Sequence, residues 1–111
     1  MKDCLFCKII KGEIPTEFLY QDENVVAFHD LHPKAPVHIL IVPKKHIDKL
    51  QDISDNDKEL LGQLLLAAKK IAGQEKIGEG FKIVINCGQK GGQEIFHLHV
   101  HLLGGWEGGV D

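Results

Sequence analysis

Residues 95–103 read Ile95-Phe96-His97-Leu98-His99-Val100-His101-Leu102-Leu103, a run in which histidine alternates with an apolar residue. A period of two is typical of a β-strand, because successive side chains of a strand point to opposite faces. The run therefore predicts a strand over 95–103 with Leu98, Val100 and Leu102 on one face. All three imidazoles would line the other face, so that three titratable side chains share one surface.

The segments before this strand predict an α+β fold. A turn-forming cluster, Asp22-Glu23-Asn24, separates two short apolar runs and indicates a hairpin. Ser54 is a good N-cap, and apolar residues recur at helical spacing from there to Gly73, which predicts one long helix. We expect one short helix over 4–10 and about five mostly antiparallel strands, at 17–21, 25–30, 37–42, 81–86 and 95–103.

Length and composition limit the classes of protein to consider. The 111 residues, 43% of them hydrophobic, suit a single domain over 1–111 with a modest core. A formal net charge of −3, without a basic block, argues against nucleic acid as a partner. The sequence shows neither a signal peptide nor an apolar run of roughly 18 residues, so we expect a cytoplasmic protein that does not bind membranes.

The three alternating histidines admit several interpretations. A polar sheet face that happens to carry histidine is the structural alternative, and three imidazoles in register make it the weakest. Three histidines can hold a catalytic zinc ion. One imidazole can instead be a nucleophile that the others support. The spacing alone does not separate the last two.

The loop before the histidines and the first cysteines suggest two further sites. Gly91 and Gly92 can turn backbone N–H groups toward an anion, although any hairpin loop also favours glycine. Cys4 and Cys7 have the two-residue spacing of a zinc clamp, which would need two more ligands from elsewhere. The alternative is a pair of small, buried thiols on the short helix.

Several ordered motifs resemble those of the histidine triad family, in its Hint branch. They are Gly91-Gly92-Gln93-Glu94-Ile95-Phe96-His97-Leu98-His99-Val100-His101, Leu103-Gly104-Gly105, Phe28-His29-Asp30, Ala35-Pro36-Val37-His38 and Val42-Pro43-Lys44-Lys45-His46-Ile47. The resemblance extends over nearly the whole chain. It implies a HIT-like fold and a nucleotide-binding hydrolase that cleaves the P–N bond of purine nucleoside 5′-phosphoramidates.

The same resemblance assigns catalytic roles to four histidines. His99 matches the nucleophile that forms a nucleotidyl-histidine intermediate, and the backbone carbonyl of His97 matches the acceptor for its Nδ1–H. Such a hydrogen bond would fix the tautomer and leave Nε2 free to attack the α-phosphorus. His101 matches a residue that binds the phosphate oxygens, with His38 beside it.

The resemblance also assigns the substrate and metal sites. Asp30 matches the residue that binds the ribose hydroxyls, while the phosphate loop and the purine pocket correspond to Asn86, Gly92, Glu94, Leu5, Phe6, Ile9, Phe28, Leu31 and Leu40. Glu94 departs from better-known members, which have serine there, so the preferred leaving group is open. His46 and His97 match the ligands that would complete a structural zinc site with the cysteine pair.

Two other functions are compatible with these residues. One is hydrolysis of dinucleoside polyphosphates, and the other is a nucleotide-binding interaction module with incidental catalysis. The family resemblance further implies a purine nucleotide ligand, a homodimer and no cofactor for catalysis. A catalytic ion held by His97, His99 and His101 would instead make activity sensitive to chelators.

Overall fold

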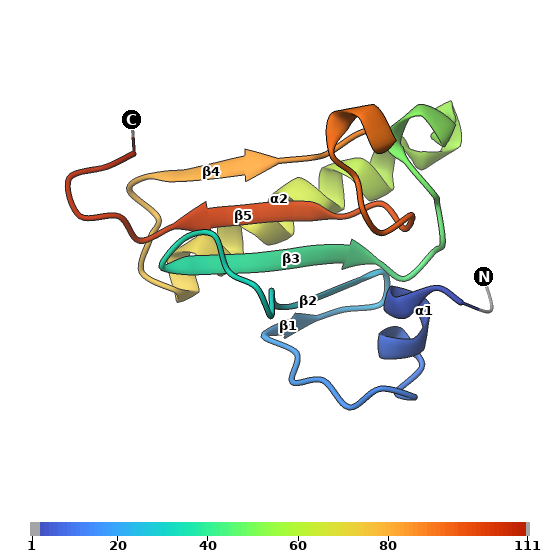
Figure 1. Cartoon of the computed structure of the whole chain (residues 1–111), viewed down its shortest axis with the longest axis horizontal. Coiled ribbons are helices and arrows are strands. Elements are labelled where there is room, and N and C mark those ends of the chain that lie inside the picture. The colour runs from blue at the N-terminus through green and yellow to red at the C-terminus, as the bar shows by residue number, and fades with distance from the viewer. Residues whose placement is uncertain (1–2, 111) are drawn as a thin grey trace.

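Five antiparallel strands form one sheet in the computed structural model, which describes residues 3–110 (Figure 1). The strands lie in the order β1-β2-β3-β5-β4. This arrangement and the two helices confirm the predicted α+β architecture. The strands are β1 (Tyr20–Gln21), β2 (Val25–His29), β3 (Val37–Pro43), β4 (Phe81–Val84) and β5 (Val100–Gly104).

The long helix α2 (Lys58–Gln74) covers one face of the sheet (Figure 1). Apolar residues at every second position of β2, β3 and β5 point to this face and pack against the buried side of the helix. The resulting main core contains Val25, Ala27, Ile39, Ile41, Leu64, Ala67, Ala68, Ile71, Ala72, Val100 and Leu102.

The short helix α1 (Leu5–Ile10) packs on the opposite face. The alternate residues of β2 and β3 point there and form a second apolar cluster with two α1 side chains. Both faces of β3 are therefore buried, as its run of β-branched residues predicts. The members of this cluster are Phe6, Ile9, Val26, Phe28, Leu40 and Val42.

A capping box precedes α2. The Ser54 side chain accepts from the N–H of Asn56 and the Asp57 carboxylate accepts from the N–H of Ser54, which satisfies backbone donors that a helix leaves unpaired. The predicted N-cap Ser54 thus begins one 3₁₀ turn at Asp55–Asp57, and the α-helix follows at Lys58. None of the helices within residues 3–110 has the length and apolar character that crossing a bilayer requires.

The predicted strand over 95–103 is correct only in its second half. β5 begins at Val100, opposite Ile41, because the backbone bends at residues 95–97 and does not continue the ladder along Val42 and Pro43. The Leu98 N–H donates instead to the Ile47 carbonyl at 2.7 Å. The other corrections are smaller: β1 is limited to Tyr20–Gln21, and β4 ends at Val84.

Strand register brings together residues that are far apart in sequence. Phe28 lies opposite Leu40 in the β2–β3 pair, and Leu40 lies opposite His101 in the β3–β5 pair. Opposite residues in an antiparallel pair point to the same face, so this row crosses the face that carries α1. His38 shares this face because it lies two residues before Leu40.

Candidate active site and metal centre

One cavity of about 590 Å³ opens on the sheet face opposite α2. We call it the main cavity. The residues that the sequence predicts for substrate binding all line it: Leu5, Phe6, Ile9, Phe28, Asp30, Leu31, Leu40, Asn86, Gly92 and Glu94. His99 and His101 line it as well. Phe28 and Leu40 are buried in the sheet and form the floor, whereas Leu31 is 89% exposed and lies at the rim.

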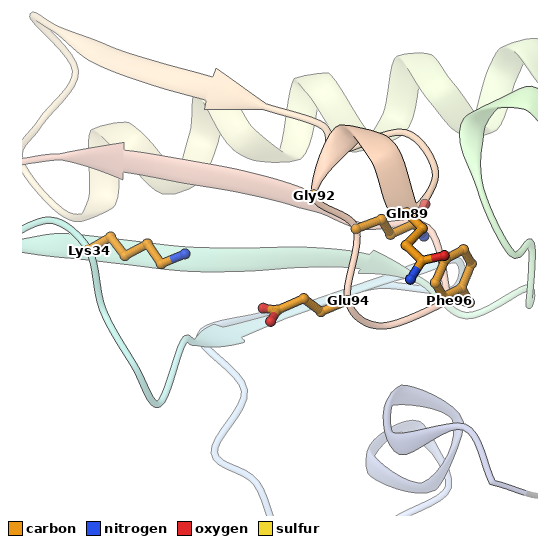
Figure 2. Close-up of a pocket in the computed structure, with 6 residues that line it drawn as sticks. Lys34, Gln89, Gly92, Glu94 and Phe96 are labelled. Carbon is orange, nitrogen blue, oxygen red and sulfur yellow. The ribbon is translucent and has the colours of Figure 1, made fainter.

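A second, more open cavity of about 560 Å³ lies beside the first, and we call it the side cavity (Figure 2). Its lining consists of Lys34, Gln89, Gly92, Gln93, Glu94 and Phe96. Lys34, Gly92 and Glu94 line both cavities, so the two openings meet at these residues. A ligand centred in the main cavity could therefore extend past Glu94 into the side cavity.

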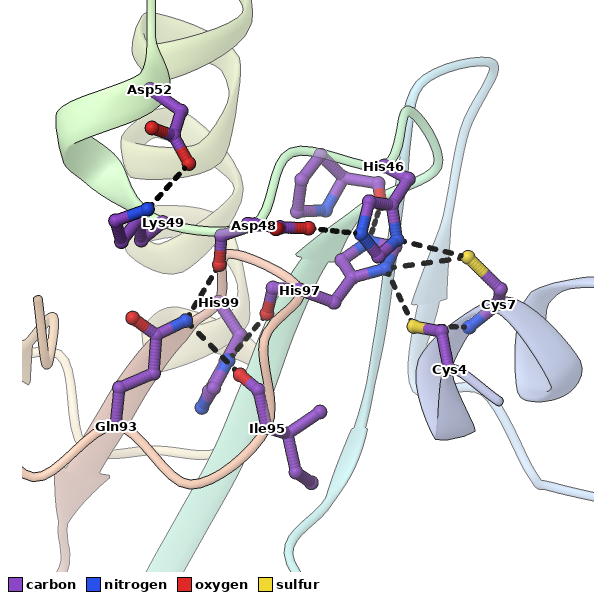
Figure 3. A network of polar contacts seen from close by, with 11 residues as sticks. Cys4, Cys7, His46, Asp48, Lys49, Asp52, Gln93, Ile95, His97 and His99 are labelled. Atoms are coloured by element: carbon purple, nitrogen blue, oxygen red, sulfur yellow. Dashed lines mark hydrogen bonds and ion pairs between the residues drawn. The ribbon is translucent and has the colours of Figure 1, made fainter. Parts of the chain in front are cut away.

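The His99 ring is held in one tautomer. Its Nδ1 lies 2.7 Å from the backbone carbonyl of His97, which can only accept, so Nδ1 carries the proton and Nε2 keeps a lone pair (Figure 3). The ring of Phe6 meets the imidazole edge-on, with centroids 5.1 Å apart. Burial lowers the pKa of His99, and the hydrogen bond to His97 offsets this in part. The neutral form, which is the nucleophilic one, is favoured.

His38 and His101 form a second ordered pair. The backbone N–H of Lys34 donates to Nδ1 of His38, so the neutral His38 ring carries its proton on Nε2. This Nε2 lies 2.9 Å from His101 Nδ1 and 3.4 Å from the Asp30 carboxylate. Because His38 Nε2–H donates to His101 Nδ1, this Nδ1 is an acceptor, and the neutral His101 ring carries its proton on Nε2. The chain of contacts therefore provides an N–H donor beside His99, at a centroid distance of 4.9 Å.

The third imidazole faces a different set of residues. The His97 ring is fully buried, and its Nε2 donates to the Pro43 carbonyl at 2.7 Å. Its Nδ1 lies 3.3 Å from Cys4 Sγ and 3.6 Å from Cys7 Sγ (Figure 3). His46 is arranged in the same way, with Nε2 on the Asp48 carboxylate and Nδ1 lying 3.3 Å from Cys7 Sγ.

These four side chains fit a tetrahedral zinc ion. Their donor atoms lie within 4.8 Å of one another. An ion with Zn–S bonds of about 2.3 Å and Zn–N bonds of about 2.0–2.1 Å would hold sulfur and nitrogen about 3.6 Å apart, close to the distances above. Both rings direct a lone pair inward while their N–H groups are taken by oxygen acceptors, as metal-bound histidines require. The cluster consists of Cys4, Cys7, His46 and His97.

The geometry does not support a metal ion held by the histidine triad itself. The nitrogens of His97, His99 and His101 do not converge as one set; instead His97 joins the cysteines, and His101 joins Asp30 and His38. The period of two does place the three rings on one side of the chain, with Leu98, Val100 and Leu102 in the main core on the other. Contacts with other parts of the fold then turn the His97 ring toward the cysteines and the His101 ring toward Asp30 and His38.

Comparison with known proteins agrees with this arrangement. The HIT domain family matches residues 11–108, which is most of the chain. This chain belongs to the HIT family. A HIT-like protein of Buchnera aphidicola is 52% identical over 102 residues, covering 91% of each chain.

Two solved HIT structures resemble the fold closely. A HIT family hydrolase from Legionella pneumophila has a TM-score of 0.92 and 50% identity, covering 95% of each chain. A histidine triad nucleotide-binding protein from Candida albicans has a TM-score of 0.82 and 37% identity, covering 90% of this chain and 73% of its own. Residue identities at these levels show common ancestry as well as a common fold.

Gln93 is a site residue of this HIT chain that the sequence did not reveal. Its side chain is 4% exposed and makes three hydrogen bonds, partly visible in Figure 3. Oε1 accepts from the N–H of Gly88, while Nε2 donates to the carbonyls of Asp48 and Ile95. Gln93 thus connects the loop at 87–93, which we call the glycine loop, to the segment that carries His46. A polar residue in a glycine-rich loop gives no sequence signal of such burial.

The glycine loop of this HIT chain has a defined shape. Gly92 has a φ of 89°, in the left-handed region, and a Cβ there would lie 3.4 Å from Asn86 Nδ2. Asn86 in turn donates to the Gly91 carbonyl at 2.9 Å. The loop therefore depends on glycine at 92 and brings Asn86, Gly92 and Glu94 to the mouth of the main cavity.

Proposed function

We propose that this protein is a nucleotide-binding hydrolase that cleaves the P–N bond of purine nucleoside 5′-phosphoramidates, with His99 as the nucleophile. The observation that carries the proposal is the hydrogen bond from His99 Nδ1–H to the His97 carbonyl at 2.7 Å. It leaves a lone pair on Nε2 of a ring that lines the main cavity. The Legionella relative's name, HIT family hydrolase, agrees with this reaction class.

The proposed reaction has two displacement steps. His99 Nε2 forms a bond to the α-phosphorus, the P–N bond breaks, and its electron pair goes to the leaving nitrogen, which takes up a proton. His101 Nε2–H, held by the chain that starts at Lys34, is positioned to donate to a phosphoryl oxygen or to this nitrogen. Water then attacks the phosphorus, releases His99 and yields the nucleoside monophosphate and a proton.

The lining of the main cavity suits a purine nucleotide. Apolar side chains from α1, β2 and β3 offer a slot for a flat base, and Asp30 offers carboxylate oxygens to ribose hydroxyls. The glycine loop and Lys34 supply backbone donors and a positive charge for the phosphate. The Candida albicans relative is named a nucleotide-binding protein, which supports the same ligand class here.

Cys4, Cys7, His46 and His97 would hold a structural zinc ion. With four protein ligands the coordination sphere is complete, so the ion would brace the fold and leave no position for substrate. Burial lowers the pKa of His97 to about 4, and its Nδ1 is therefore free of a proton at neutral pH. We propose no cofactor in the reaction itself.

We also propose that the protein forms a homodimer in the cytoplasm. Leu65 and Leu66 on α2 are 48% and 61% exposed, and Ile83 on the edge strand β4 is 39% exposed. Ile83 lies opposite Leu102, so it points to the face that carries α2. A second copy could cover these apolar side chains. Light scattering of wild type and Leu66→Glu tests this, with a monomeric wild type contradicting it.

Turnover of an adenosine 5′-phosphoramidate by wild type and His99→Ala, each with and without a chelator, tests the reaction. We expect the variant to lose at least about 10³-fold in kcat while AMP still binds. Loss of wild-type activity on rapid chelation would favour a catalytic ion instead. Binding of AMP without turnover would favour an interaction module. Preference for a dinucleoside polyphosphate would favour the other hydrolase function.

A further inference from the structure

We propose that the side cavity receives the leaving group and that Glu94 selects amines carrying a second positive charge, such as short alkyl diamines. This inference rests on the proposed function, because it concerns what is bonded to the phosphorus that His99 attacks. Gln89, Gln93 and Phe96 line the side cavity and not the main cavity, which would hold the nucleotide. They are therefore available for a different part of the substrate.

The connection between the cavities defines where the leaving group can go. A phosphoryl group beside Gly92 and His101 would lie where the two cavities meet. The apolar part of the main cavity would already hold the nucleoside. A second substituent on the phosphorus therefore has the side cavity as its route, past Glu94 toward Phe96 (Figure 2).

Two charged side chains, Lys34 and Glu94, line the side cavity, and only Lys34 lies near the histidine pair. Neither Lys34 nor Glu94 takes part in the ion pairs found among residues 3–110. The backbone of Lys34 contacts His38, which places this lysine near the histidines that would bind the phosphoryl group. Its positive charge would then complement the phosphate. A leaving group in the side cavity would face the negative charge of Glu94.

The surroundings of Glu94 favour a cation with an alkyl chain. Figure 2 shows Glu94 between Lys34 on one side and Phe96 with Gln89 on the other. Phe96 is 41% exposed, so part of its ring is open to a ligand. The exposed part of the ring offers a π face to an ammonium group and a surface to methylenes. The Glu94 carboxylate, which extends toward Lys34 in Figure 2, adds a negative charge where the two cavities meet. An anionic leaving group would meet repulsion from Glu94.

The test compares phosphoramidates of adenosine that differ only at the far end of the amine. We would measure kcat/KM for conjugates of butylamine, 1,4-diaminobutane and 4-aminobutanoate with wild type, Glu94→Gln and a control, Glu23→Gln. Glu23 is exposed in the turn after β1 and lines neither cavity. The control removes the same net charge elsewhere.

We expect wild type and Glu23→Gln to prefer the diamine conjugate over the butylamine conjugate by about two- to fivefold, the range for an exposed charge pair. The aminobutanoate conjugate should be the poorest substrate. In Glu94→Gln the ratio of diamine to butylamine should approach one, and in wild type it should fall as salt is added. Equal kcat/KM for the two conjugates in wild type, or an unchanged ratio in Glu94→Gln, would overturn the inference. Absence of turnover on all three conjugates would instead contradict the proposed function.

Discussion

The Nδ1 of His99 lies 2.7 Å from the backbone carbonyl of His97, while the His97 ring points to Cys4 and Cys7. One residue thus contributes its main chain to the proposed nucleophile and its side chain to the proposed metal centre. Because the two groups share a Cα atom, a backbone shift that moves the ring also moves the carbonyl. The cysteine cluster and the hydrogen bond that fixes the His99 tautomer therefore both depend on the position of His97.

Protein purified without chelator should contain about one zinc ion per chain, and Cys7→Ser should lose it. Loss of the ion removes a cross-link between α1, the segment after β3 and His97, so the melting temperature should fall by at least about 5 °C. Cys87→Ser is the matched control, because Cys87 lies outside the cluster and its Sγ contacts the Ile85 carbonyl. Substoichiometric zinc in wild type, measured by atomic emission, would contradict the metal site.

Gln93→Ala should destabilise the fold and impair the glycine loop. The change removes the hydrogen bonds of the buried Gln93 side chain to the Gly88 N–H and the Asp48 carbonyl, each worth about 0.5–1.5 kcal/mol in the free energy of unfolding. Activity should fall with it, because the loop carries Asn86 and Gly92 to the main cavity.

Urea unfolding and kinetics on Gln93→Ala and a control, Gln74→Ala, measure these effects. Gln74 is exposed at the end of α2 and has no such contacts. Equal midpoints for the two variants would show that the Gln93 network contributes nothing.

The sequence predicts the sheet well where alternation and local turns decide the structure. The strands at 25–30 and 37–42 lie within one residue of β2 and β3, because both faces of these strands are buried and their register follows from the pattern. The strand over 95–103 is wrong in its first half. Residues 95–97 form bends, and the Leu98 N–H donates to Ile47 in the segment after Pro43, a contact that no local pattern encodes.

The site shows the same difference between what sequence motifs predict and what depends on contacts between distant segments. The ten residues that motif resemblance predicts for substrate binding all line a single cavity. The direction of the His97 ring could not be read from the triad, because Cys4 is 93 positions away in the sequence. Lys34, whose backbone orders His38, and Gln93 were missed for the same reason: their roles depend on partners that only the folded chain supplies.

Acid should destabilise the folded protein below neutral pH. Burial, together with the neighbouring His99 and His38, lowers the pKa of His101 to about 4, and burial also lowers the pKa of His38. The unfolded chain, with histidine pKa values near 6.5, then binds more protons than the folded one. The free energy of unfolding should therefore fall as pH drops from about 6.5 toward 4, by up to about 1.4 kcal/mol per pH unit for each such histidine.

Urea titrations of zinc-loaded wild type and His101→Asn at several pH values between 4.5 and 7.5 measure this linkage. The variant lacks one of the histidines with a lowered pKa, so its stability should depend less steeply on pH than that of wild type. Parallel curves for the two proteins would show that His101 titrates in the folded protein as it does in the unfolded chain.

Gly105→Ala should be less stable than wild type, and the change should disturb the contact between His38 and His101. Gly105 has a φ of 90°, and a Cβ there would lie 3.0 Å from Pro36 Cβ and 3.3 Å from Val37 Cγ2. The left-handed backbone alone costs alanine about 1–2 kcal/mol, and the contacts push on the residues just before His38. Gly62→Ala is the control, because this helical position has open space and should gain about 0.5–1 kcal/mol. Thermal unfolding and kcat/KM on a phosphoramidate, measured for both variants, test this prediction. A Gly105→Ala protein as stable and active as wild type would show that the Pro36–His38 segment shifts without affecting the site.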